Sequence, residues 1–251
     1  MPILPGSVNG SMAKLAWLFT VFIMFIATTF ASPRSYLEAQ KIAETIFNAH
    51  RQTLYCGCHY ERFNQVDLAS CNMQGSGHFK EAHMVEWEHI MPIELIGQEF
   101  PCWQEPLCHR DGIAFQGREC CRQISELFRQ AEAELYNLWP VIGLVKQART
   151  SYQYGELRSN ETFWGCDIQL DNTLSQFEPS DRAKGIVARA NLFMAYRYNI
   201  KLSNAQHKLF EEWNKQYPPD EWEKKWAASV AIAEGYSNPY IAIPKATAIP
   251  R

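Results

Sequence analysis

The sequence predicts an α+β fold, mostly helical, in a single domain that disulfides hold together. Three observations predict it. Several segments after residue 32 have the apolar spacing and end residues of helices, whereas residues 85–92 alternate between apolar and polar side chains. All eight cysteines lie in this same part of the chain. No repeat or low-complexity linker divides it, and with 251 residues, 47% of them hydrophobic, one core can form.

The first 31 residues are typical of a secretory signal peptide. Lys14 precedes an uncharged apolar run over residues 15–30, which ends in small residues. We expect cleavage after Ala31, with Met12 as an alternative start, and one mature domain over residues 32–251. A single membrane anchor is the alternative, but the run is shorter than the ~20 residues that a spanning helix needs. We therefore expect an exported protein, periplasmic or secreted, without stable membrane association after cleavage.

The cysteine count indicates disulfides. An even number of cysteines in an exported chain is usually fully paired, although one sequence does not reveal the connectivity. Cys120 and Cys121 are adjacent, so we expect them to pair with different partners. A zinc site at Cys56-Gly57-Cys58-His59 is the alternative, with a spacing shorter than zinc sites usually have. The predicted disulfide residues are Cys56, Cys58, Cys71, Cys102, Cys108, Cys120, Cys121 and Cys166.

The helices follow from apolar spacing and end signals. Residues 35–51 and 122–138 each carry an apolar stripe, and Pro140 would end the second, with Asn137 in its last turn. Residues 143–178 look irregular, with short strands. Three further helices are expected at residues 181–199, 203–217 and 220–233, where Ser203 caps the second and Gly235 follows the third.

The segment Met84–Pro92 carries the most chemistry. Val85, Trp87 and His89 alternate with Glu86 and Glu88, which predicts a short strand. A carboxylate can hold a hard cation, and a neutral imidazole can take a proton from water near pH 7. Alternation would place Glu88 and His89 on opposite faces unless the strand ends there. The alternative is an ordinary polar pair on the surface.

The charge excludes a tight, passive nucleic-acid binder. The formal charge is −3, and removal of Lys14 with the signal peptide lowers it by one. Residues 182–201 are nevertheless basic and contain no acidic residue. Lys184 and Arg189 in this run could contact phosphates, or the run could be a solvated helix face.

Ordered motifs run over residues 39–240, and the two most specific are Trp87-Glu88-His89-x-Met91-Pro92 and Ala131-Glu132-x-x-Leu135-x-Asn137-Leu138-x-Pro140. With these motifs the chain resembles the endonuclease I family. These are secreted or periplasmic nonspecific DNA nucleases of the ββα-metal (His-Me finger) superfold. The chain departs from the family at Lys146-Gln147-Ala148, where an Asn-Gly-Asp run is usual, and between Glu105 and Arg118, which is longer and adds Cys108.

The resemblance implies a site and a reaction. His89 would be the general base, Arg118 a phosphate ligand and Glu86 a supporting carboxylate. Glu88 and Asn137 would hold one Mg²⁺, which Ca²⁺ or Mn²⁺ could replace. Contacts to backbone phosphates would come from Lys184, Arg189 and Arg149.

The expected function is a Mg²⁺-dependent nonspecific endonuclease. DNA is the expected partner, RNA is open as a second substrate, and the products would carry 5′-phosphates. A monomer is expected. The alternatives are another exported metal-dependent phosphohydrolase, or an inactive nucleic-acid-binding module on the same scaffold.

Overall fold

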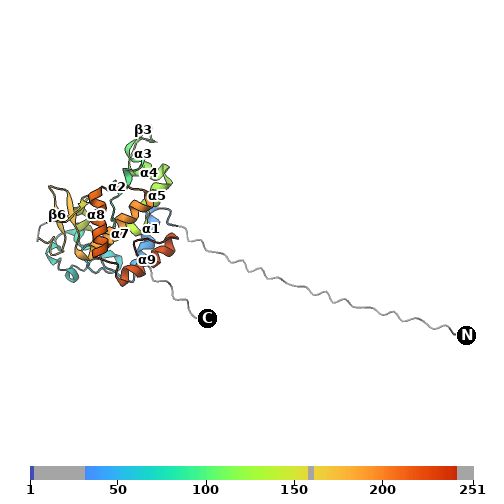
Figure 1. Cartoon of the computed structure of the whole chain (residues 1–251), viewed down its shortest axis with the longest axis horizontal. Coiled ribbons are helices and arrows are strands. Elements are labelled where there is room, and N and C mark those ends of the chain that lie inside the picture. The colour runs from blue at the N-terminus through green and yellow to red at the C-terminus, as the bar shows by residue number, and fades with distance from the viewer. Residues whose placement is uncertain (3–31, 158–160, 242–251) are drawn as a thin grey trace.

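The computed structural model describes residues 1–2, 32–157 and 161–241. The predicted signal peptide lies outside these residues, apart from its first two. Helices and short sheets form one body, from which the segment with α3, α4 and β3 projects (Figure 1). No helix in the described ranges is long and apolar enough to cross a membrane. This arrangement of helices and sheets confirms the α+β prediction.

The body of the fold is helical. Helix α1 spans Tyr36–Phe47, α7 Asp181–Tyr198, α8 Asn204–Gln216 and α9 Glu221–Glu234. Ser35, Ser203 and Asp220 each accept a hydrogen bond from a first-turn backbone amide, which satisfies a donor that the helix leaves free. Gly235 ends α9 with a φ of 80°, a conformation that glycine adopts without strain. The predictions for these helices are confirmed.

The strand that carries Glu88 and His89 is β1, Val85–His89. It pairs antiparallel with β4, Leu138–Ile142, in a two-stranded sheet that places His89 opposite Leu138. Helix α6, Gly143–Arg149, follows β4 directly and was not predicted. These two strands and one helix position the pocket described below.

The single helix predicted at residues 122–138 is wrong. The chain forms α4 at Arg118–Ile124, α5 at Glu126–Glu132, a 3₁₀ turn at Leu135–Asn137 and then β4. Ser125 separates α4 from α5, because its side chain caps α5 through the amide of Phe128. Leu138 continues the helical spacing of the apolar residues but is buried as a strand residue instead. Pro140 fits β4 because a sheet of two strands leaves each strand an edge.

The remaining elements are short. Strands β2, Cys108–Arg110, and β3, Ile113–Phe115, form a hairpin. Strands β5, Gln153–Tyr154, β7, Gln176–Glu178, and β6, Gln169–Asp171, form a three-stranded sheet in that order. The others are α2, Ile93–Gly97; α3, Pro101–Gln104; and 3₁₀ turns at Arg62–Asn64, Leu68–Cys71, Gln74–Ser76 and Lys80–His83.

All eight cysteines form disulfides, as predicted. The adjacent Cys120 and Cys121 have different partners, which ties α4 to β2 and to α3. The zinc alternative is wrong, because Cys56 and Cys58 lie in two separate disulfides. The four bonds are Cys56–Cys166, Cys58–Cys71, Cys102–Cys121 and Cys108–Cys120.

Candidate active site

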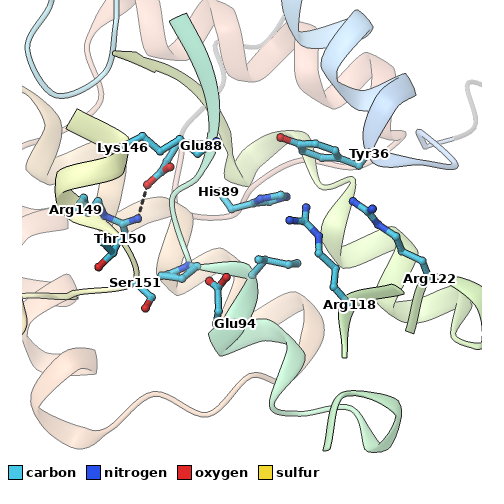
Figure 2. A pocket seen from close by; sticks show the side chains of 12 residues that line it. Tyr36, Glu88, His89, Glu94, Arg118, Arg122, Lys146, Arg149, Thr150 and Ser151 are labelled. Atoms are coloured by element: carbon cyan, nitrogen blue, oxygen red, sulfur yellow. Dashed lines mark hydrogen bonds and ion pairs between the residues drawn. The ribbon is translucent and has the colours of Figure 1, made fainter. Parts of the chain in front are cut away.

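A pocket of about 550 Å³ opens where β1 ends, beside α4 and α6. Figure 2 shows its side chains, which come from segments far apart in the sequence. Glu88 and His89 both line it, because β1 ends at His89 and the alternation stops there. The other lining residues are Tyr36, Pro92, Ile93, Glu94, Arg118, Arg122, Lys146, Arg149, Thr150 and Ser151.

His89 is held in one orientation. Its Nε2 atom lies 2.8 Å from the backbone carbonyl oxygen of Glu132, and its ring stacks on Tyr36 with 5.0 Å between centroids. A carbonyl can only accept, so Nε2 must donate the proton, which leaves Nδ1 unprotonated. Burial lowers the pKa of His89 to about 4. The imidazole is therefore neutral near pH 7 and has one basic nitrogen.

Glu88 forms a buried ion pair with Arg149. The Nη1 atom of Arg149 donates to Oε1 of Glu88, and its Nη2 donates to the carbonyl oxygen of Ile90 at 2.9 Å. Burial raises the pKa of Glu88, an effect that the charges of Arg149 and Lys146 oppose. Both terminal nitrogens of Arg149 are thus bound within the protein. The expectation that Arg149 contacts DNA is corrected: it is buried and fixes Glu88 instead.

Asn137 lies behind the pocket. Its Oδ1 accepts from the Met91 amide at 2.7 Å, and its Nδ2 donates to the Met91 carbonyl at 3.1 Å. The Asn137 carbonyl also accepts from the amide of Ile90. Asn137 is fully buried and fastens the end of β4 to the turn after His89. The structure thus brings Asn137 beside the strand end, but not into the lining of the pocket.

Glu86 does not line the pocket but pairs with Lys146, which does. Its Oε2 accepts from Lys146 Nζ at 3.0 Å, and Lys146 also donates to the carbonyl of Trp87 at 2.9 Å. Both side chains are about one-third exposed. Glu86 therefore influences the pocket through its ion pair with Lys146.

Arg118 and Arg122 lie on the side of His89 opposite Glu88 (Figure 2), and both bind the carboxylate of Glu132. Arg118 Nε donates to Glu132 at 2.5 Å, and Arg122 donates to the same carboxylate at 2.7 Å through Nε and Nη2. Burial would raise the pKa of Glu132, but the hydrogen bonds from the two arginines hold it below its usual value. Glu132 thus orders three pocket residues, His89 through its backbone and the arginines through its side chain.

The donors present fit a hard divalent cation that takes most of its ligands from water and substrate. Arg149 engages only Oε1 of Glu88, so the second carboxylate oxygen is left for a cation. No group of three or more His, Cys, Asp or Glu residues in the described ranges could hold a metal. Such a sparse set suits Mg²⁺, which keeps several waters, and does not suit a structural zinc.

Lys184 and Arg189 are buried and do not form the exposed basic face that was expected. Arg189 is 2% exposed and donates to Glu223 on α9 at 2.6 Å and 2.5 Å. Lys184 is 8% exposed and binds Glu178 at 2.8 Å and Asp181 at 2.7 Å. The expectation that these two residues contact DNA is therefore corrected: they are buried, and carboxylates of β7, α9 and the first residue of α7 occupy their donors.

Sequence reasoning missed several pocket residues. Arg122 lies four residues after Arg118, a spacing that puts both on one helix face, but the predicted helix began only at residue 122. Glu132 belongs to a matched motif and was given no role. Nothing local to Tyr36, Glu94 or Thr150 indicates that they approach His89, because they come from three other elements or turns.

Comparison with known sequences identifies the family of this chain. The Endonuclease I family profile matches residues 34–245. The chain belongs to the endonuclease I family. An extracellular deoxyribonuclease of Aeromonas hydrophila is 32% identical over 83% of this chain and 89% of its own.

Two further relatives are similar to this chain over most of its length. A periplasmic deoxyribonuclease of the same organism is 31% identical over 78% and 80% of the two chains. An Endonuclease-1 of Buchnera aphidicola subsp. Acyrthosiphon pisum is 27% identical over 91% of each. For an endonuclease I family member, the pocket with Glu88, His89 and Arg118 is the candidate active site.

Proposed function

We propose that this chain is an exported, Mg²⁺-dependent endonuclease that hydrolyses DNA without sequence preference. The observation that carries this proposal is the pairing of a neutral, oriented His89 with Glu88 and two arginines in one pocket. The relatives named as deoxyribonucleases support DNA as the substrate. Four disulfides and the extracellular or periplasmic relatives support action outside the cytoplasm.

The fold at the site supports a ββα-metal, or His-Me finger, assignment. Antiparallel strands β1 and β4 are followed by α6, and β1 ends in Glu88 and His89. Helix α6 then returns Lys146 and Arg149 to the same pocket. We propose that this unit is the catalytic element of the domain.

His89 acts as the general base. Its Nδ1 takes a proton from the attacking water, while the carbonyl of Glu132 keeps Nε2 protonated and holds the ring in place. The water oxygen attacks phosphorus as the bond to the 3′ oxygen breaks. The departing 3′ oxygen takes a proton from a second water molecule, so the products are a 5′-phosphate and a 3′-hydroxyl. Arg118 binds the nonbridging phosphate oxygens through its terminal nitrogens, since Glu132 engages its Nε.

Glu88 holds the cation, with Arg149 fixing its carboxylate. The expectation that Asn137 is a second ligand is corrected, because Asn137 is fully buried, its amide group is bonded to the backbone of Met91, and it does not line the pocket. A bound Mg²⁺ would polarise the scissile phosphate and stabilise the charge on the departing oxygen. Ca²⁺ or Mn²⁺ are alternatives in the same site. RNA is a further candidate substrate, and we propose that the protein acts as a monomer.

A plasmid assay tests the proposal. The oxidised mature protein should convert supercoiled DNA to nicked and then short products in millimolar Mg²⁺, and EDTA should stop the reaction. End-labelling with and without prior phosphatase treatment should reveal 5′-phosphates. Intact plasmid in Mg²⁺ and Mn²⁺, with a folded protein, would refute the function. A parallel reaction with structured RNA measures the preference between the two nucleic acids.

A further inference from the structure

Two arginines on α4 share a single carboxylate at the rim of the pocket. Arg118 and Arg122 are separated by one helical turn and both bind Glu132, which is 2% exposed. The side chains of Arg118 and Arg122 are 37% and 43% exposed. One negative charge therefore faces two positive charges, and a net positive charge remains at this end of the pocket.

The two arginines differ in their distance from His89. Arg118 lies over the ring of Tyr36 at 5.5 Å, and that ring stacks on His89. Arg122 lies one turn further along α4, on the side away from His89 (Figure 2). Residues one turn apart on a helix are separated by ~5–6 Å, which is comparable to the spacing of successive phosphates along a nucleic acid strand.

Each arginine also keeps donors for a ligand. Glu132 engages Nε of Arg118, and Nε and Nη2 of Arg122. Among the described residues, no other acceptor binds Nη1 or Nη2 of Arg118, or Nη1 of Arg122. Guanidinium groups fixed by one buried carboxylate are pre-oriented, so little side-chain entropy is lost when a phosphate arrives.

We propose that Arg122 binds the backbone phosphate next to the scissile one, while Arg118 binds the scissile phosphate. This inference rests on the proposed function and adds a nucleic acid subsite to it. The disulfides Cys102–Cys121 and Cys108–Cys120 hold α4, and so both arginines, at this spacing. The contact carries no base information and so serves an enzyme without sequence preference.

The test measures DNA binding in a His89→Ala background, so that the DNA stays intact. Binding of a fluorescent double-stranded oligonucleotide is followed by anisotropy over a series of salt concentrations. Arg122→Ala should weaken binding roughly ten-fold or more, the scale of one charge-assisted hydrogen bond. It should also lower the slope of log affinity against log salt by about one. Arg122→Lys should restore the slope, because the charge remains.

Arg110→Ala is the matched control. Arg110 is an exposed arginine of the same projecting segment, is paired with Glu119, and does not line the pocket. It should change neither affinity nor slope. Thermal melting of each variant checks that α4 has kept its place.

Kinetics of the same substitutions in the active enzyme separate binding from positioning. Arg122→Ala should raise KM for DNA and leave most of kcat, whereas Arg118→Ala should lower kcat. An unchanged salt slope in a folded Arg122→Ala protein would overturn the proposal, as would a loss confined to kcat, which would make Arg122 a support for Glu132. A wild-type protein that leaves DNA intact refutes the proposed function instead, and the binding assay still reports on Arg122.

Discussion

The backbone carbonyl of Glu132 accepts a hydrogen bond from His89 Nε2 at 2.8 Å, which selects the tautomer of the proposed catalytic base. The same residue uses its side chain to hold Arg118 and Arg122. One residue at the end of α5 thereby connects the proposed general base to the two arginines that we propose bind phosphate. Because the contact to His89 is made by the backbone, no side-chain substitution at Glu132 removes it directly.

His89→Ala should abolish turnover and spare DNA binding. The imidazole acts on a proton that moves only in the transition state, so kcat should fall by roughly 10²–10⁴-fold while the affinity for DNA is kept. Steady-state cleavage and anisotropy on the same oligonucleotide measure the two quantities. His83→Ala is the control, because His83 also contacts a backbone carbonyl but lies outside the pocket. Near-normal kcat in His89→Ala would exclude it as the base.

Glu88→Gln should weaken cation binding. Loss of the carboxylate charge removes the strongest ligand for Mg²⁺, and we expect at least a ten-fold rise in the dissociation constant. Calorimetric titration with Mg²⁺, or with Ca²⁺ as a probe, measures this without turnover. Glu99→Gln, an exposed glutamate outside the pocket, is the control. Equal affinities in the Glu88 variant and the wild type would place the cation elsewhere.

The sequence predicted the central residues of this site but not the residues around them. Glu88 and His89 could be predicted because five consecutive residues hold both the chemistry and the strand pattern. Arg149 could not be assigned as the partner of Glu88, because they lie sixty-one residues apart and meet only through the β1–β4 pairing and α6. The apolar residues around Asn137 fit helical spacing, so the sequence predicted one continuous helix there and missed the change from helix to strand β4. Lys184 and Arg189 on α7 were expected to contact DNA, because the sequence does not show that the fold brings Glu178 of β7 and Glu223 of α9 against them.

Stability should decrease as the pH rises from about 5 to 8, because of Glu134. Burial, together with the nearby Glu234, raises the pKa of Glu134 to about 8. The folded state therefore keeps a proton that the unfolded chain releases above its ordinary pKa of ~4.3. The stabilising contribution is complete below that value and is lost as pH rises to the folded pKa, by at most ~1.4 kcal/mol per pH unit for one proton.

Urea unfolding at pH 5, 6, 7 and 8 tests this pH dependence. Glu134→Gln keeps the shape and an acceptor for Tyr198 and Tyr236, whose hydroxyls lie 2.9 Å and 2.7 Å from Oε2 of Glu134. The variant should show a shallower decline in unfolding free energy than the wild type. Parallel pH profiles for the two proteins would mean that Glu134 does not titrate in this range.

Arg189→Ala should destabilise the fold and leave the salt dependence of DNA binding unchanged. Arg189 joins α7 to Glu223 on α9, to Asn214 on α8 at 3.1 Å, and to the carbonyl of Tyr217 at 2.7 Å. Its removal leaves the buried carboxylate of Glu223 without a partner, which typically costs about 3–5 kcal/mol. Urea unfolding measures this loss, and the salt series used for Arg122 measures the slope.

Arg197→Ala is the control on the same helix, because its exposed guanidinium lies against Tyr198 and Tyr236 and forms no ion pair within the described ranges, so that its loss should cost about 1 kcal/mol or less. A second variant, Arg189→Met with Glu223→Leu, should regain much of the stability, since neither charge is then buried alone. A stable Arg189→Ala protein with a reduced salt slope would return this arginine to the DNA-binding surface.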